Sequence, residues 1–414
     1  MRIRLFLASA SLLAAMPTAP AQSASSLPPT PQVLAALDGH PTVAAARARL
    51  EAARAQGVGL RRGAQEAVVN GSYIRRSVDR EGGYDEFDIT VSRPFRLPGK
   101  AGLDREAGNL GVDVAENRME DVRHQTALEL ATLWFDWLSA GELHRNDRDS
   151  AVLARKAVEA VRLRRRLRDA SDLEVDQAVA ALGQIEAQAA ASLAEREQAR
   201  AKLAANFPDL VMGDEPPPLA APVLPDGGLD RLRDKVVENS HEIVAADREA
   251  MRMDVLARRA RADRMADPSF GVRMFSERSG MERGAGVVAS IPLGGGHRRA
   301  LADQAGAEAD AARFELSAVQ RSVEATASAD LSGARSRHAA WIEMEKAASA
   351  ADAAAGRTEQ GNALGHIDLA DLLYARRQAR ETRRAEIEAR AEAHRAITRL
   401  RIDAHALWLD EHVQ

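Results

Sequence analysis

The chain has 414 residues, about three times the length of a typical single domain. Hydrophobic residues make up 45% of it but aromatic residues only 4%, and alanine runs such as residues 189–191 and 353–355 supply much of the apolar share. Because large cores depend on bulky side chains, this composition argues against a thick globule. Charged residues at 29% exclude a bundle of membrane-spanning helices, and the net charge of −4 gives no reason to expect nucleic acid as a partner.

The first 21 residues have the character of a secretory signal peptide. Arg2 and Arg4 form a basic start, residues 5–15 an apolar core, and residues 19–21 a small-residue cleavage site. We therefore expect an exported protein. Since the chain contains no cysteine, we expect neither disulfides nor a lipid attached at an N-terminal cysteine.

The sequence contains two copies of one plan, because three landmarks recur in the same order at nearly constant spacing. The landmark pairs are His40-Pro41 with Ser240-His241, residues 93–100 (RPFRLPGK) with 291–298 (IPLGGGHR), and residues 167–178 with 364–375. A proline- and glycine-rich segment that can form neither a helix nor a central strand separates the copies. We therefore expect a first repeat over residues 22–207, a linker over 208–228 and a second repeat over 229–414.

Within each repeat the hydrophobic period changes from that of a helix to that of a strand and back. In the first repeat we expect helices over residues 42–66, 102–167 and 171–206, with a hairpin of strands near residues 69–73 and 86–92. In the second repeat we expect helices over residues 242–266, 298–364 and 367–407, with a hairpin near residues 269–274 and 285–291. Each long helix would be a rod of roughly 100 Å, which no compact domain can hold. The two shorter helices of each repeat, laid end to end, match the rod, so we expect an elongated cylinder wall with the hairpin at one end.

The expected strands have one apolar and one polar face. Phe87, Ile89 and Val91 alternate with Asp88 and Thr90, and the second repeat shows the same period. In an exported protein, this alternation over about ten residues matches outer-membrane β-barrel strands, although an ordinary half-buried sheet has the same period. Four strands cannot close a barrel and open edges are not tolerated in lipid. A membrane barrel therefore requires several chains, and a trimer would supply about twelve strands.

The order of these features resembles the TolC family of outer-membrane efflux ducts. The resemblance rests on the strand-ending segments 94–100 (PFRLPGK) and 291–299 (IPLGGGHRR) and on the tip motif 364–373 (LGHIDLADLL). It covers nearly the whole mature chain and implies a mainly α protein with a small β part. In that family a long α-helical barrel and a membrane β-barrel close only in a homotrimer. The resemblance also implies a periplasmic adaptor and an inner-membrane efflux transporter as partners, and no cofactor.

The strand-to-helix exits are the first group of candidate positions. Pro94 and Pro292 are expected to end strands, because proline cannot donate to the ladder. Gly99 and Gly295 are expected to allow the change of chain direction from strand to helix, because glycine adopts backbone conformations that other residues avoid.

The far helix tips are the second group. Gly365 is expected to supply the turn between rod and return helix in the second repeat. Arg168 occupies the equivalent position in the first repeat, so we expect that turn to be made another way, with Asp169 and Ser171 capping the return helix.

The resemblance implies that these tips form the periplasmic aperture, narrowed by acidic side chains. Asp371 matches an acidic position of the tip motif, and Glu174 is its counterpart in the first repeat. Tyr374 stands where some members have a second acidic residue, which puts a double acidic ring in doubt.

Basic residues crowd the first tip. We expect Arg165, Arg166 or Arg168 to pair with Asp368 or Asp371 across the closed aperture, since guanidinium and carboxylate can bond bidentately. The alternative is that these charges only solvate an exposed helix end, where ion pairs contribute ~1 kcal/mol or less.

No motif predicts catalysis. Residues 294–296 precede a helix, but their spacing fits neither nucleotide-binding fingerprint, and we find no hydrolase elbow or zinc-protease helix. We therefore expect no enzyme.

Two further groups of residues have structural explanations. The expected helix-packing residues are Trp134, Phe135 and Trp137, and the expected frayed tail, preferred over a metal site, contains His405, Asp410, Glu411 and His412.

The sequence thus predicts an outer-membrane duct that passively conducts substrates from an inner-membrane pump across the periplasm and outer membrane. A soluble periplasmic coiled-coil or adaptor-like protein is the alternative, because it would share the long alanine-rich helices. The Pro94 to Lys100 segment resembles that of the cation and heavy-metal efflux branch, with small organic drugs as the open alternative.

Overall fold

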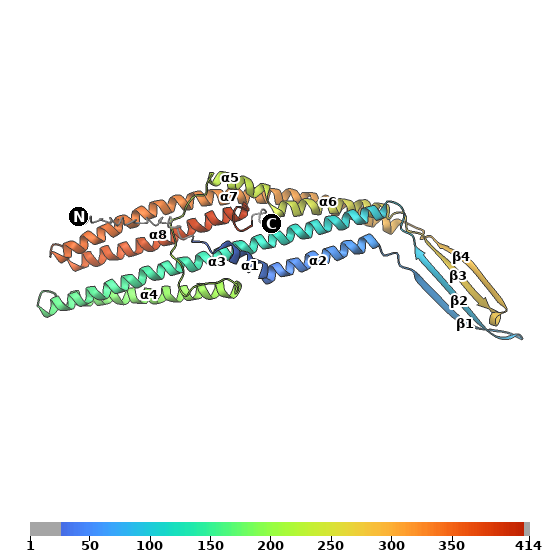
Figure 1. Ribbon diagram of the computed structural model, residues 1–414, viewed down its shortest axis with the longest axis horizontal. Helices are drawn as coiled ribbons and strands as arrows, with labels where there is room; N and C mark the ends of the chain where they lie inside the picture. The colour runs from blue at the N-terminus through green and yellow to red at the C-terminus, as the bar shows by residue number, and fades with distance from the viewer. Residues whose placement is uncertain (1–25, 410–414) are drawn as a thin grey trace, which may run out of the picture.

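The computed structural model describes residues 26–409, so the predicted signal peptide lies outside the described residues. The helices run side by side along one long axis, and the strands form a sheet at one end (Figure 1). This arrangement confirms the predicted class, a mainly α protein with a small β part to which each repeat contributes one hairpin.

The elements follow the predicted order in both repeats. The first repeat contains α1 (Thr30–Gly39), α2 (Pro41–Arg62), β1 (Val68–Val78), β2 (Gly82–Pro94), α3 (Lys100–Arg166) and α4 (Asp172–Asn206). The second contains α5 (Gly228–Glu238), α6 (His241–Ala262), β3 (Ser269–Glu277), the 3₁₀ turn η1 (Arg278–Gly280), β4 (Glu282–Ser290), α7 (Gly296–Ala363) and α8 (Leu369–Asp403). The helices α1 and α5 are additional to the predicted elements, because 10 and 11 residues hold too few turns to display a clear period.

The rods α3 and α7 have 67 and 68 residues. α2 and α4 pack along α3, and α6 and α8 pack along α7, so each rod lies beside two shorter helices placed end to end, as predicted (Figure 1). The repeats meet where α3 packs against α6 and α8. We call α3–α4 the first helical hairpin and α7–α8 the second. No helix within residues 26–409 combines the length and the apolar character that a membrane crossing requires.

Small side chains let the helices approach closely. Eight described residues of α7 are buried, and all of them except Val323 are alanine. Where α2 meets α3, a Cβ on Gly108 would lie 3.0 Å from the Gly57 Cα. The alanine-rich composition therefore serves close helix-to-helix contact along the rods, where native packing density leaves no room for larger groups.

Bulky side chains gather midway along the helical body, in a cluster we call the equatorial core. Trp134, Phe135 and Trp137 are at most 5% exposed there, which confirms that they pack between helices. Their neighbours in the cluster include Leu37, Leu203, Phe207, Leu219 and Ile402. The core thus joins α1, α3, α4, the linker and α8 in one place.

Residues 216–220 of the linker, which we call the strap, cross from α3 to α8. On the α3 side, Arg145 Nη1 donates to the Pro216 carbonyl oxygen at 3.0 Å. The Pro216 ring also covers Gly141 so closely that a Cβ there would lie 2.0 Å from the Pro216 Cγ. On the α8 side, Arg390 Nη1 donates to the Leu219 carbonyl oxygen at 2.8 Å. The strap therefore holds the two repeats together at one level of the helical body.

The four antiparallel strands form one open sheet in the order β1-β2-β3-β4. β2 and β3 pair across the repeats, from Phe87 opposite Ser276 to Pro94 opposite Ser269. β1 and β4 are the edges, so within the described chain each has one side without a partner strand.

The strand register collects apolar side chains on one face of the sheet. One row across all four strands reads Val69, Val91, Val272 and Val287. On the opposite face Arg273 forms an ion pair with Asp88, and Arg76 Nη2 lies 2.8 Å from Glu86 Oε1. The sheet therefore has one apolar and one charged face, as the alternation of the sequence predicts.

Candidate functional site

The first helical hairpin turns at its tip through two backbone hydrogen bonds. The Arg168 N–H donates to the Arg165 carbonyl oxygen at 3.0 Å, and the Asp169 N–H donates to the Arg164 carbonyl oxygen at 2.9 Å. This pair of bonds is the Schellman motif, which ends a helix with one residue in the left-handed conformation.

The second helical hairpin makes the same turn. The Gly365 N–H donates to Asn362 at 3.0 Å and the His366 N–H to Gly361 at 2.9 Å. The φ angle is 76° at Gly365 and 63° at Arg168. The expectation that the first turn is made another way is therefore wrong. The turn is the same, but Arg168 adopts a conformation that costs a non-glycine residue ~1–2 kcal/mol.

Helix caps follow both turns. Ser171 forms a capping box with Glu174, which confirms Ser171 as the predicted cap. Asp169 accepts a side-chain hydrogen bond from the end of α3 instead of capping α4. In the second repeat Asp368 accepts a hydrogen bond from the Asp371 N–H at 2.8 Å. Two residues predicted at the aperture, Glu174 and Asp368, thus stabilise helix starts.

The basic residues of the first tip that were expected to pair across the aperture are Arg165, Arg166 and Arg168. Arg165 Nε donates to Asp172 Oδ1 at 2.6 Å, within its own helical hairpin. Among residues 26–409 of one chain, no hydrogen bond or ion pair joins the three arginines to the aspartates of the tip motif. Pairing between copies of the chain stays a prediction.

Apolar side chains bring the two tips together. Leu369 and Leu372 of α8 are 3% and 5% exposed, because they pack against Val158 and Val161 of α3 and Ala178 of α4. We call this cluster the tip contact. This contact is not among the predicted features, although two leucines three residues apart at the start of a helix are a signal of a buried face.

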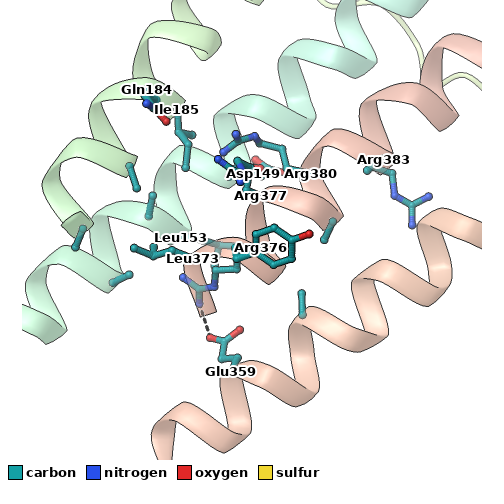
Figure 2. A pocket seen from close by; sticks show the side chains of 18 of the residues that line it. Asp149, Leu153, Gln184, Ile185, Glu359, Leu373, Arg376, Arg377, Arg380 and Arg383 are labelled. Atoms are coloured by element: carbon teal, nitrogen blue, oxygen red, sulfur yellow. Dashed lines mark hydrogen bonds and ion pairs between the residues drawn. The ribbon is translucent and has the colours of Figure 1, made fainter. Parts of the chain in front are cut away.

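A groove of about 760 Å³ lies between the two helical hairpins, beside the tip contact (Figure 2). α3 and α4 supply apolar side chains to it, including Leu153 and Ile185, and α8 supplies a row of arginines. Tyr374, predicted at the aperture, lines this groove, and the guanidinium carbon of Arg377 lies 5.7 Å from the centre of its ring.

The strand-to-helix exits differ between the repeats. Pro94 is the last residue of β2, and Gly99, with φ of 89°, precedes α3 as predicted. In the second repeat β4 ends before Pro292, and the positive φ of 93° falls on Gly294. Gly295 has an extended φ of 178°. The left-handed turn of the second exit therefore lies one residue earlier than predicted.

Lys100 anchors the first exit to the second repeat. Its buried ammonium group lies 2.8 Å from carboxylate oxygens of both Asp263 and Asp267, and it donates to the Met265 carbonyl oxygen at 2.7 Å. Burial disfavours the ionised form of Asp267, but hydrogen bonds from Lys100 and from the Leu97 N–H outweigh burial and lower its pKa. Three fixed acceptors thus surround one ammonium group at the junction of helices and sheet.

A second ion network lies beside Lys100. Asp104, which is buried, lies 3.1 Å from Arg96 Nη1 and 2.6 Å from Arg259 Nε. Because Arg96 belongs to the first repeat and Arg259 to the second, the network joins them. Arg96 and Lys100 belong to the segment 94–100 that carries the family resemblance, and nothing in the sequence pattern indicates their role as anchors.

Histidines and carboxylates form a polar cluster between α3, α6 and the end of α8. His124 Nε2 lies 2.8 Å from Asp403 Oδ1, and its Nδ1 lies 4.0 Å from Asp121 Oδ1. The His405 ring centre is 5.9 Å from that of His124 and 4.9 Å from that of His241. The cluster therefore connects the first repeat to the end of the second.

The surroundings of His124 favour its charged form. Burial by itself lowers the pKa of His124, but the interactions with Asp121 and Asp403 outweigh burial and raise the pKa to about 9. Within residues 26–409 no three such side chains are placed to hold a metal ion. His405 is 9% exposed with φ of 53°, so its expected place in a frayed tail is wrong, while residues 410–412 lie outside the described residues.

Solved structures match nearly the whole chain, whereas no protein-family model and no curated protein matches it. The outer-membrane channel OprN is 21% identical at a TM-score of 0.77, covering 92% of this chain and 90% of that one. The CmeC outer-membrane channel of Campylobacter jejuni is 15% identical at 0.75, covering 90% and 84%. The MtrE outer-membrane channel of Neisseria gonorrhoeae, in its open state, is 18% identical at 0.72, covering 93% and 90%.

These likenesses establish the fold. The chain has the fold of outer-membrane channels, and the resemblance to the TolC family is confirmed at that level.

The conformation of Arg168 generates a prediction about tip stability. Arg168→Gly removes the left-handed penalty and should slow hydrogen exchange at the end of α3 several-fold, corresponding to about 1 kcal/mol. Gly365→Ala is the matched opposite change, because no atom lies within 4 Å of the added Cβ and only the backbone conformation disfavours it. Hydrogen exchange of peptides covering each tip measures both. Equal exchange in the variants and the parent would contradict the assigned strain.

The raised pKa of His124 predicts a pH dependence of stability. Since the folded-state pKa is about 9 and the unfolded one about 6.5, the stabilisation is fully present below pH ~6.5 and is lost as pH rises through ~9. His124→Gln should therefore lower the free energy of unfolding by up to ~3 kcal/mol at pH 6 and by much less at pH 9.5. Urea unfolding across this range measures the difference. The exposed His297→Gln is the control, and a His124→Gln deficit that does not shrink with pH would refute the charged pair.

Proposed function

We propose that this chain is one subunit of a homotrimeric outer-membrane duct that conducts substrates passively from an inner-membrane efflux pump. The observation that carries the proposal is the open four-stranded sheet with one apolar face, at the end of rods of 67 and 68 residues. The fold that the chain shares with outer-membrane channels supports the same role.

The apolar face of the sheet supports a place in lipid. Val69 is 66% exposed, Val272 54% and Val287 83%, although all three lie in one row. A contiguous apolar face of this kind is unusual on a protein surrounded by water. In contact with the hydrocarbon of a bilayer, the apolar face no longer exposes its side chains to water. Arg273 and Asp88, on the other face of the sheet, line a water-filled interior.

The sheet edges support assembly. β1 and β4 each leave backbone groups without a strand partner in the described chain. A backbone group without a hydrogen-bond partner costs on the order of 2–7 kcal/mol in hydrocarbon. Pairing β1 of one copy with β4 of the next satisfies them, and three copies close a barrel of about twelve strands. The rods of the three copies then form the α-helical barrel that extends into the periplasm.

The partners and cargo of the duct follow from the family resemblance. We infer a periplasmic adaptor that meets the helix tips and an inner-membrane transporter that supplies energy and selects the cargo, metal cations or small drugs. The segment resembling the cation branch gives little support to either cargo, because its Arg96 and Lys100 are engaged in ion networks at the sheet junction. The duct itself needs no catalytic group, which accords with a sequence that contains no catalytic motif.

A soluble coiled-coil or adaptor-like protein is the alternative, and strand substitutions distinguish it from a duct. Val91→Arg places a charge on the apolar face and should cost ~2–4 kcal/mol in lipid. Thr90→Arg, one residue away on the polar face, is the matched control. We expect the parent and Thr90→Arg in the outer-membrane fraction as trimers and Val91→Arg depleted from it. Recovery of the parent protein in the soluble periplasmic fraction without detergent would contradict the proposal of an outer-membrane duct.

The tips offer a test of the aperture. We propose that arginines of the first tip pair with Asp371 or Asp368 of a neighbouring copy when the duct is closed. Arg168→Ala and Asp371→Ala should then each raise the resting conductance of the reconstituted channel several-fold, because each removes one partner of a charge-assisted contact. Glu345→Ala, on the exposed side of α7, is the control. Unchanged resting conductance in both tip variants would contradict the proposed pairing at the aperture.

A further inference from the structure

The groove between the helical hairpins has the size of a ligand site. Its volume of about 760 Å³ falls within the range of small-molecule pockets, roughly 300–1,000 Å³. All four helices of the two hairpins line it, and Figure 2 shows side chains from α3 and α4 facing those of α8 across the space. A molecule held there contacts both repeats at once.

One wall of the groove is apolar. α3 contributes Leu153 and Ala154, α4 contributes Ala181 and Ile185, and α8 adds Leu373 at the end nearer the tip contact. Leu153 is 52% exposed in spite of its position on a rod. The wall therefore offers apolar surface that the fold leaves in contact with water.

The opposite wall carries four arginines of α8, two of which have partners. Arg376 Nη2 lies 2.6 Å from Glu359 Oε1, and Arg383 forms an ion pair with Asp352. These pairs neutralise the two acidic residues that α7 contributes to the groove.

The other two arginines keep their charge available. Arg380 makes no hydrogen bond or ion pair with any residue in the described part of the chain. Arg377 has only Glu381 at 4.0 Å, on its own helix, and the Tyr374 ring. Since residues three apart lie on one helix face, these two guanidinium groups are neighbours.

One more acidic residue lines the groove. Asp149 of α3 accepts a hydrogen bond from Arg148 Nε at 3.2 Å, and its side chain is 67% exposed. Its charge is therefore screened by water and offset by Arg148, so Arg380, together with Arg377 and its distant partner Glu381, supplies the positive charge of the groove.

We propose that this groove binds a soluble amphipathic organic anion, a carboxylate or sulfonate with an apolar body of ring or chain carbon. The anionic head accepts hydrogen bonds from Arg377 and Arg380, whose planar guanidinium groups suit such oxyanions. The apolar body covers Leu153 and Ile185 and removes their surface from water.

The absence of cysteine allows a test confined to the groove. Ala181→Cys supplies the only thiol of the full-length chain, on the α4 wall, and Ala339→Cys supplies a control thiol on an exposed part of α7. The rate of labelling by N-ethylmaleimide is measured on protein in lipid nanodiscs. The anionic probe is 1-anilinonaphthalene-8-sulfonate, and the neutral control is N-phenyl-1-naphthylamine at equal free concentration, which has the same body without the sulfonate.

We expect the anionic probe to slow labelling at Ala181→Cys about fivefold or more at saturation and to leave Ala339→Cys unaffected. Adding Arg377→Gln and Arg380→Gln should raise the probe concentration needed for half-maximal protection about tenfold or more, since each removes a hydrogen bond to a charged group. Arg321→Gln, at an exposed position of α7 outside the groove, is the matched control and should leave protection intact. Equal protection by the neutral probe, protection that survives the double substitution, or no protection at all would each overturn the proposal.

Discussion

The buried ammonium group of Lys100 is the contact on which the arrangement of sheet and rods depends. It binds the first turn of α3 to Asp263 at the end of α6 and to Asp267 before β3, so it fixes the start of one repeat's rod against the other repeat's strands. A buried charge contributes stability only when its partners are fixed in place, and removing one partner of such a pair typically costs ~3–5 kcal/mol. The same contact lies next to the point where β2 meets β3, at Pro94 opposite Ser269, from which the register of the apolar row continues across the sheet.

Away from this junction, the helical body is held by contacts between small side chains. Gly57 against Gly108 and the alanines of α7 bring helices together at distances that larger residues would prevent. Bulky side chains gather at the equatorial core and the tip contact, where the two repeats meet, and in a third cluster formed by α5, α7 and α8 within the second repeat. Between the equatorial core and the tip contact the hairpins separate enough to leave the groove.

The sequence predicted those features that depend on residues close together in the chain. Proline-free periodic segments predicted both rods to within two residues at each end, and alternation predicted the faces of the strands. The partners of Lys100 and the contact of Asp104 with Arg259 could not be predicted, because these pairs join residues more than 150 positions apart and form only once the repeats have packed.

The prediction for the turn at the first tip was wrong for a different reason. Reading Arg168 by its own preference excluded the left-handed turn, whereas two hydrogen bonds to the end of α3 impose it. The pairing of Arg165, Arg166 or Arg168 across the aperture stays a prediction, because the sequence contains their charges but not the directions of their side chains. In the folded chain the carboxylate nearest to Arg165, that of Asp172, lies directly across the turn.

The strap has a mechanical consequence for the tips. Because it fastens α3 to α8 at the level of Gly141 and Arg390, and the tip contact joins the hairpins beyond that level, a tilt of both hairpins about the strap would act as a single lever on the tips. From Gly141 to the end of α3 the lever is roughly 38 Å long at ~1.5 Å per residue, so a tilt of about 5° displaces the tip by about 3 Å. An angular change too small to disturb the packing at the pivot is therefore magnified at the far end to about the width of a water molecule.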